Sequence, residues 1–515
     1  MSHFQVDALE HDALQVLNLV RSMKNSLALI NKIPPDVLFL IPNYWEDSNR
    51  DTGLINLTHV CHSWRELFIS CPLLWACLDC ASVDKTKTYI ERSKSSPLEI
   101  YLQHSNNPFH QEEALILAAT HVGRLRTISA EGGLTQVFTV LAKHFSGPTP
   151  HLKKLDVRHV RYYGPAPTLP NELLNGDLPS LRELCLIGVI TSLPWRGLSN
   201  LITFTLGCDE IPLTHLLDFF ESSPSLRHIY FNNSIPDSSN PPAKRLVSLP
   251  NLKDLSVIAQ PAPSILLNHL SIPTGASLSL VLTHGGNESP ILSGLPKSLK
   301  NLKNLSHINA INLCLGSGQR SVRLNGPSGG LYIRSNWTPQ GGGRNSATDR
   351  FLRSVDKFDL SRSQRLAVMQ YNDRPQPATQ AVTYALYQII HPMEDLRILT
   401  LTQCNNPPFI LTLNPTKNPD GIVLCHKLEE ITFYIERSDQ LRLDELLSMA
   451  KERALRGAKL SGITVVSQEK LLQTGWLYRL RKTWWLFRLR KHVSHVEYKV
   501  DDAVPAWDAL PGMKV

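Results

Sequence analysis

The segment LPSLRELCLIGV (178–189) contains the spacing that decides the fold, L-x-x-L-x-L, at residues 181–186. The last two leucines of this spacing are two residues apart, so both lie on one face of a short strand, and the residues between them point to the other face. Each such segment therefore predicts a strand with one apolar and one polar face. The same spacing, with other apolar residues at some positions, recurs at LKKLDV (152–157), LITFTL (201–206), LRHIYF (226–231), LKDLSV (252–257), LRILTL (396–401) and LEEITF (428–433).

The segments recur with a regular period. The first leucines of the five amino-terminal segments are separated by 29, 20, 25 and 26 residues, which is the period of leucine-rich repeats. One strand cannot bury its apolar face alone, but stacked neighbours form a parallel sheet with a continuous core. The sequence therefore predicts an α/β fold in which residues 146–470 form a leucine-rich-repeat-like solenoid, with a curved parallel sheet and helices on its convex side.

The pattern is irregular in places. The Asn or Cys that usually follows the strand of such a repeat is found only at Cys404. Between residues 257 and 396 the period is obscured. There, LRSVDKFDL (352–360) is the best candidate for a degenerate unit, and residues 316–343 are expected to form an irregular insertion.

A helix is predicted over residues 1–30, where apolar residues recur at spacings of three to five. The spacing favours a helix that packs on the rest of the chain over a coiled coil, because no sustained heptad pattern is apparent.

Residues 31–80 predict a compact helical block. The pair Pro34–Pro35 suits the first turn of a helix, where a missing N–H group is not needed. A polar loop is expected at 45–53, followed by a second helix over 54–68 that ends before Pro72. The next stretch, 81–145, is expected to form a helical linker or a first irregular repeat.

The pieces INKIPPDVLFLIPNYW (30–45) and LINLTHVCHSWRELFISCPLLWACLDC (54–80) together resemble the F-box as it occurs in basidiomycete fungi. The paired prolines and the Val-Cys-x-x-Trp-Arg stretch at 60–65 carry this resemblance. YIERSKSSPLEIYL (89–102) is similar to the linker that joins the F-box of that family to a degenerate leucine-rich-repeat region. The resemblance extends from about residue 31 to about residue 510.

The resemblance implies a non-enzymatic adaptor. Its F-box would dock on the Skp-type adaptor of a cullin–RING (SCF-type) ubiquitin ligase, and its repeats would hold an unknown target protein near the ubiquitin-loaded enzyme, which raises the effective concentration of target lysines. A block of about fifty residues cannot bury so many large apolar groups internally, so an exposed partner site is expected. The expected docking residues are Ile33, Pro34, Pro35, Val37, Leu38, Ile41, Leu57, Val60, Cys61, Trp64 and Leu67. The alternative is a repeat-based interaction scaffold whose F-box is vestigial and not linked to ubiquitin.

Candidate target contacts are the side chains on the polar faces of the predicted strands. Their mixed charge favours a protein surface over a nucleic-acid backbone, so no nucleic acid is expected. Three rows are predicted: Lys154, Asp156 and Arg158; His228, Tyr230 and Asn232; and Glu430, Thr432 and Tyr434.

Catalytic and metal motifs are weak. GPSGG (326–330) matches the G-x-S-x-G motif of serine hydrolases, but both flanks alternate like strands, so a hairpin turn is predicted instead of a strand–turn–helix elbow. The Gly-rich run 341–343 lacks the Lys-Ser/Thr of a phosphate loop. Cys77 and Cys80 form a single pair, whereas structural zinc sites usually bring two. No catalytic residue, cofactor or metal is therefore expected.

Composition is ordinary for a globular protein. The net charge of +8 comes from 53 Lys and Arg against 45 Asp and Glu, which is a weak bias over 515 residues. Nine scattered cysteines without a preceding secretory signal favour a reducing compartment, the cytoplasm or the nucleus. No apolar run is long enough for a transmembrane helix.

The carboxy-terminal stretch 471–515 is expected to form a basic aromatic tail. Its core, WLYRLRKTWWLFRLRKH (476–492), favours a packed terminal helix with one apolar face formed by Leu477, Leu480, Trp484 and Phe487. Binding to a membrane surface, or to nucleic acid or another partner, are the alternatives.

Overall fold

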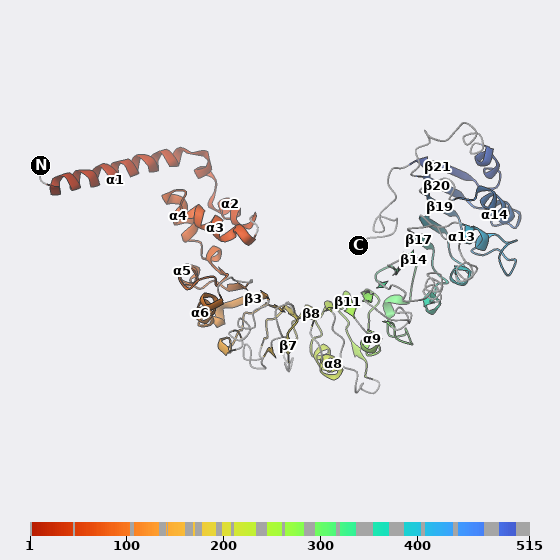
Figure 1. Cartoon of the computed structure of the whole chain (residues 1–515), viewed down its shortest axis with the longest axis horizontal. Helices are drawn as coiled ribbons and strands as arrows, with labels where there is room; N and C mark the ends of the chain where they lie inside the picture. Colours follow the sequence, from red (N-terminus) through yellow and green to blue (C-terminus); the bar gives the residue numbers. More distant parts are fainter. Residues whose placement is uncertain are drawn as a thin grey trace. The chain divides into compact units, whose positions relative to one another are not determined.

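The computed structural model describes residues 3–44, 47–102, 108–132, 141, 143–159, 168–169, 178–191, 198–207, 211–232, 245–259, 263–282, 294–315, 320–335, 354–369, 386–402, 407–435, 441–467 and 484–500. The chain divides into two compact units, Met1–Leu198 and Ser199–Val515. It is a mixed α/β protein, and seventeen of its described strands belong to a large, mostly parallel sheet arrangement (Figure 1).

The described elements of the first unit are helical up to Trp75. They are α1 (His3–Leu27), η1 (Leu29–Lys32), α2 (Pro35–Leu38), η2 (Ile41–Tyr44), α3 (Asp47–Thr58), α4 (His62–Ile69) and η3 (Pro72–Trp75). The helix expected in residues 1–30 is present, but every described side chain of α1 is exposed. The packing on the rest of the chain that the sequence favoured is therefore not observed.

Two details of the helical segment differ from the sequence prediction. The expected single helix over 54–68 is divided into α3 and α4, because Cys61 adopts extended backbone angles (φ −160°, ψ 169°) and serves as the N-cap residue of α4. The polar loop expected at 45–53 is mostly helical, since α3 already begins at Asp47. Asp and Ser are favourable at a helix start, where they complement unpaired N–H groups and the helix dipole.

We call Leu29–Trp75 the helical block. Its core is aromatic: the Trp64 ring lies edge-on to Phe68 at 5.7 Å, and Phe39 approaches Phe68 at 6.0 Å. Trp64 Nε1 donates a hydrogen bond to Asn31 Oδ1 at 2.5 Å, and Trp75 Nε1 donates one to the Phe68 carbonyl at 2.9 Å. These bonds satisfy the polar atoms of both indoles, as buried Trp residues require.

Parallel strands follow in the first unit. They are β1 (Cys77–Leu78), β2 (Leu98–Leu102), β3 (Leu125–Gly132), β4 (Lys154–His159) and β6 (Glu183–Ile187), each paired with the next. Between them run α5 (Val83–Ser93), α6 (Pro108–Ala119) and η4 (Val122–Arg124), while β5 (Thr168–Leu169) and β7 (Ile190–Thr191) form a separate pair. Local sequence starts α5, because the Ser82 hydroxyl accepts a hydrogen bond from the Lys85 N–H group.

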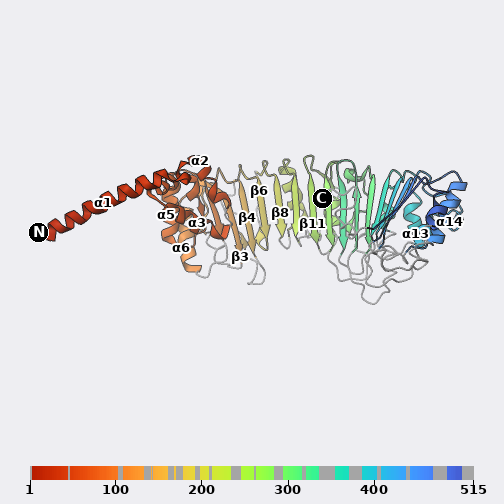
Figure 2. The ribbon, with the colours of Figure 1, turned by 90° about the horizontal axis from the view of Figure 1, so that it is seen from above.

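The second unit continues the parallel pattern over twelve strands of the main sheet. They are β8 (Thr203–Gly207), β9 (His228–Asn232), β11 (Asp254–Ala259), β13 (Ser277–Leu282), β14 (Ala310–Leu315), β15 (Arg320–Asn325), β16 (Gly330–Ser335), β17 (Arg365–Met369), β18 (Ile398–Thr402), β19 (Glu430–Ile435), β20 (Gly462–Ser467) and β21 (His495–Val500). A further pair joins β10 (Val247–Ser248) to β12 (Leu270–Ser271). Figure 2 shows these strands side by side.

One region of the second unit breaks the parallel order. There the spatial order is β13-β16-β15-β14-β17, and β15 runs antiparallel to both of its neighbours. Two strands are thus inserted into the sheet between residues 316 and 335, which explains why the sequence period is obscured and confirms an irregular insertion there. In the described part of the expected unit at 352–360, residues 354–360 contain η8 (Ser354–Lys357) and no strand, and β17 begins at Arg365.

The leucine pattern is confirmed as a strand signal. All seven segments run into strands, namely β4, β6, β8, β9, β11, β18 and β19, and these pair in parallel. The first leucine of each segment is buried just before its strand. Apolar residues of the strands fill the core, for example Phe204 of β8 and Phe231 of β9, which pack on Phe219 and Phe220 of α8 (Leu213–Ser222).

Helices of the second unit lie on one side of its strands. They are α8, α9 (Ser264–Leu267), α13 (Pro407–Leu413) and α14 (Leu443–Leu455), all on the outer side of the curve that the strands describe (Figure 1). Arg453 anchors α14, because its buried guanidinium donates hydrogen bonds to the carbonyls of Leu424 (2.7 Å) and Cys425 (2.8 Å). Burial of this guanidinium lowers its pKa to about 10.

Candidate interaction surfaces

The helical block has an unusually apolar surface. Among the described residues of this 47-residue block, seven large apolar side chains are 41–81% exposed. The described part of the following 440 residues has nine exposed large apolar side chains, which are 37–69% exposed. A large exposed apolar surface of this kind is typical of a protein–protein interface. The seven residues are Leu29, Ile30, Val37, Leu40, Ile55, Val60 and Leu73.

The docking residues expected from the sequence divide into three groups. Pro34, Pro35, Val37 and Val60 are exposed; Ile33, Ile41, Cys61 and Leu67 are half-buried; and Leu38, Leu57 and Trp64 are buried. The third group forms the internal core of the helical block and does not reach the surface. Burial by the block itself therefore accounts for the apolar spacing of these three residues.

Sequence reasoning missed five of the exposed apolar residues: Leu29, Ile30, Leu40, Ile55 and Leu73. A signal existed for Leu40, which lies three residues after Val37 and hence on the same side of that turn. No comparable signal marks Leu73, which lies in η3 directly beside the buried Leu74 and Trp75.

The polar face of the first unit's sheet is largely self-neutralised. Arg158 donates two hydrogen bonds to the Asp156 carboxylate, at 2.8 and 3.1 Å, and these bonds raise the pKa of the guanidinium. Lys154 approaches Asp156 at 3.9 Å and Glu183 of the next strand at 3.7 Å. The predicted row is thus brought together, with Asp156 buried between two cations.

In the second unit, the row His228, Tyr230 and Asn232 lies along the polar face of β9. His228 Nδ1 lies 2.8 Å from Asp254 Oδ2 of β11, and the Tyr230 side chain is exposed. The register places Ser256 opposite Tyr230 and Ser279 opposite Ser256. The polar face of β9, β11 and β13 therefore presents hydroxyl groups and one His–Asp pair.

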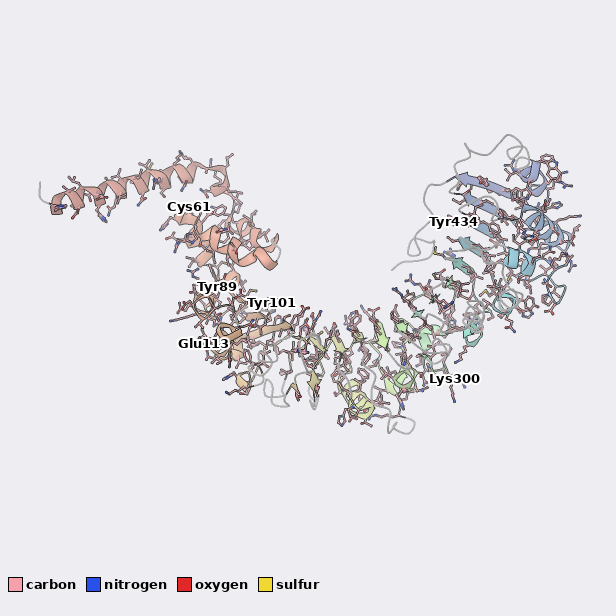
Figure 3. The ribbon with its side chains drawn as sticks, viewed as in Figure 1. Cys61, Tyr89, Tyr101, Glu113, Lys300 and Tyr434 are labelled. Carbon is pink, nitrogen blue, oxygen red and sulfur yellow. The ribbon has the colours of Figure 1, made fainter. Side chains whose placement is uncertain are left out.

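The third predicted row, Glu430, Thr432 and Tyr434, lies on β19. In register, Thr432 has Thr400 of β18 on one side and Thr464 of β20 on the other. Thr400, Thr432, Tyr434 and Thr464 are all half-buried. Tyr434, which is labelled in Figure 3, lies between the buried Phe433 and Ile435 along β19, so it shares the face opposite the core with these threonines. This face is therefore rich in hydroxyl groups.

The centre of the same face is basic. The six neighbouring strands β13, β16, β15, β14, β17 and β18 contain four arginines and no Asp or Glu. Three of the arginines, Arg323, Arg334 and Arg365, alternate with core residues and so lie on the polar face; we call them the arginine strip. The Arg323 guanidinium lies 5.1 Å from the centre of the Tyr332 ring. The arginine strip could not be predicted from the sequence, because it depends on how the inserted strands are ordered in the sheet.

The hydrolase motif lies in a hairpin turn, as predicted. Residues 326–329 connect β15 to β16, and Asn325 pairs with Gly330 across the antiparallel ladder. A Cβ atom on Gly329 would come within 2.4 Å of the Ala276 carbonyl oxygen, so the turn requires glycine there. Ser328 is exposed between two strands and not at the start of a helix, which removes the geometry of a nucleophile elbow.

The cysteines do not gather into a metal site among the described residues, where no group of three His, Cys, Asp or Glu side chains is close enough to hold an ion. Cys80 is buried, and this burial raises the pKa of its thiol to about 12. The Gly-rich run 341–343 lies outside the described residues.

In the carboxy-terminal stretch, residues 484–489 are helical, and this helix packs on the rest of the unit through another face than expected. Trp485, Leu489 and Val493 are buried, and Trp485 Nε1 donates a hydrogen bond to the Leu443 carbonyl at 2.9 Å. Trp484 and Phe487, which were expected on the packed face, are exposed. They instead lie beneath cations: Arg488 is 4.4 Å from the Trp484 ring, and Lys491 is 5.2 Å from the Phe487 ring. Leu477 and Leu480 fall outside the described residues.

No protein-family model matches the chain, and no curated protein matches it either. Within the part of the chain that the structure describes, no helix has the length and apolar character needed to cross a membrane.

Proposed function

We propose that this chain is a substrate-recognition adaptor of a cullin–RING ubiquitin ligase. In this proposal residues 31–80 form an F-box that docks on the Skp-type adaptor, and the strands up to residue 470 form a leucine-rich-repeat-like solenoid that binds a target protein. The chain does no chemistry itself. The observation that carries the proposal is the density of exposed large apolar side chains on the helical block.

The proposed docking on the Skp-type adaptor is supported by the apolar side chains that the helical block exposes to water. Large apolar side chains such as Val37, Leu40 and Val60 remain half exposed to water in the isolated chain, and covering the exposed half of each contributes about 1 kcal/mol. The block already has a core of its own, formed by Leu38, Trp64 and Phe68. Its outer apolar residues are therefore available to a partner without any rearrangement of that core.

The target half rests on the polar faces of the strands. A neutralised row at Asp156, a hydroxyl-rich face around Thr432 and the arginine strip offer hydrogen bonds and positive charge on regular elements. Of these surfaces, the hydroxyl-rich face and the arginine strip of the second unit suit a folded or extended protein with acidic groups. Holding the target protein on these strands raises the effective concentration of its lysines near the ligase.

The proposal is tested by co-purifying the full chain with the host's Skp-type adaptor. Val37→Glu and Val60→Glu place a charge on the exposed surface and should abolish capture while leaving the circular dichroism spectrum unchanged. Leu455→Glu is the matched control, because Leu455 is also exposed and apolar but lies on α14.

A folded wild-type chain that captures no adaptor would contradict the ubiquitin function. The remaining function would then be a repeat-based interaction scaffold with a vestigial F-box. Loss of capture with Leu455→Glu as well would show that the loss is not specific to the helical block.

A further inference from the structure

The first helix, α1, carries a continuous apolar stripe. Seven of its residues follow one another at spacings of 3, 4, 3, 4, 3 and 4, which is the spacing of the two core positions of a heptad repeat. The expectation that residues 1–30 lack a sustained heptad pattern was therefore wrong. All seven are exposed, and the six larger ones are 46–75% exposed. They are Val6, Leu9, Ala13, Val16, Val20, Met23 and Leu27. Figure 2 shows α1 as one uninterrupted helix.

A helix of this kind needs a cover. Isolated helices draw little stability from propensity, and most of their stability in proteins comes from packing an apolar face. The 25 residues of α1 extend for about 37 Å at 1.5 Å per residue. None of the described residues buries this stripe, which leaves it open to contact with a further helix.

The spacing indicates that the cover is another helix. Heptad positions match a facing helix, whose side chains form holes for them. A lipid surface would favour many basic residues on the polar face, but α1 has three acidic residues and two basic ones.

The charges along α1 indicate which helix fits. The acidic residues Asp7, Glu10 and Asp12 all lie in the first half, and the basic residues Arg21 and Lys24 lie in the second half. A second copy laid antiparallel therefore brings each acidic half against a basic half. A parallel copy would place like charges beside each other, which is unfavourable.

We propose that α1 pairs antiparallel with the α1 helix of a second copy of this chain. An axis at Asn18 places Val16 against Val20 of the second copy, Ala13 against Met23, and Leu9 against Leu27, so that the small Ala13 is matched by the long Met23. In the same register Glu10 faces Lys24 of the second copy. Leu17 and Leu19, which are also exposed, flank the centre of the pair.

The test is the mass of the full chain in solution, measured by analytical ultracentrifugation at micromolar concentration. The expected species has twice the monomer mass of 57.8 kDa. Val16→Glu combined with Val20→Glu should raise the dimer dissociation constant by about 100-fold or more, because each places an unpaired charge in the core of the pair. Asn18→Glu adds charge to the outer face and should leave the dimer intact.

Charge reversal distinguishes the two orientations. Glu10→Lys and Lys24→Glu should each weaken the dimer about 3- to 10-fold, and the double reversal should restore it. Restoration fails if the helices are parallel, since these two positions do not then face each other. A monomeric wild-type chain would overturn the proposal. So would a monomer whose α1 stripe binds lipid vesicles and loses that binding with Val16→Glu and Val20→Glu.

Discussion

The helical block and the sheet of the second unit expose opposite kinds of side chain to solvent. Among its described residues the block leaves seven large apolar side chains in water. The polar face of the sheet instead presents Thr, Ser, Tyr and Arg on strands whose other face is largely apolar. Both have well-packed cores. The difference lies in their partners: the first surface suits a constant apolar contact, and the second suits a polar, orientation-dependent one.

The largest expected effect is a difference in thiol reactivity between a cysteine of the helical block and a cysteine beside the sheet. Burial raises the pKa of the Cys425 thiol beside the sheet to about 12 from the usual 9.0, whereas Cys61 of the helical block is half-buried. The rise lowers the thiolate fraction of Cys425 about 1,000-fold near pH 8. Iodoacetamide labelling followed by mass spectrometry should modify Cys61 long before Cys425.

The same shift gives a pH dependence of stability. The folded chain keeps the Cys425 proton to a higher pH than the unfolded chain does, so its contribution is fully present below about pH 9 and is lost as the pH rises towards about 12. Denaturant midpoints that rise over this range would contradict the burial of this thiol.

Loss of the aromatic core should be the largest mutational effect in the helical block. Trp64→Ala removes the buried indole, its edge-on contact with Phe68 and its hydrogen bond to Asn31. We expect a loss of about 3–5 kcal/mol in the free energy of unfolding of the block. Urea denaturation followed by Trp fluorescence and circular dichroism measures it. A Trp64→Ala chain of unchanged stability would mean that Trp64 belongs to the docking surface.

The exposed surface of the block should behave in the opposite manner. Val60→Glu should change the unfolding free energy by less than about 0.5 kcal/mol, as is usual for surface positions. Its affinity for the Skp-type adaptor should fall by at least about 100-fold, below the level that co-purification retains, because a charge is then buried without a partner in the complex. Isothermal titration calorimetry measures this change, with Leu455→Glu as the control that should retain affinity.

The smallest expected effect is on target binding. Arg323→Ser or Arg334→Ser should weaken binding of a model acidic peptide to the arginine strip about 5- to 10-fold each, and the loss should shrink as the salt concentration rises. Fluorescence anisotropy at two ionic strengths measures it. Arg456→Ser, on an exposed arginine just after α14, is the control, and an equal loss there would assign the binding to net charge.

Much of the sheet could be predicted from sequence, because its signal is local. A leucine spacing and a turn motif are enough to predict β4, β6 and the GPSGG hairpin, and the structure confirms all three. The order of β14, β15 and β16 could not be predicted, since an antiparallel insertion depends on pairing between distant residues. The arginine strip was missed for that reason.

The helical block was harder for a different reason. Apolar residues at spacings of three and four lie on both sides of its short helices, so spacing alone does not separate Trp64, which is buried, from Val60, which is exposed. The break at Cys61 rotates the direction of α4 relative to that expected of one continuous helix. The packed face of the helix at 484–489 was also predicted wrongly from spacing, because Trp485 is buried and Trp484 is exposed.

Adaptor capture by the intact chain tests the central claim most directly. The wild type and Val60→Glu would each be co-expressed with the host's Skp-type adaptor and purified through a tag on the full chain. The account predicts a stoichiometric complex for the wild type and none for a folded Val60→Glu chain. A wild-type chain with an intact fold that purifies alone, or a Val60→Glu chain that retains the adaptor, would contradict it.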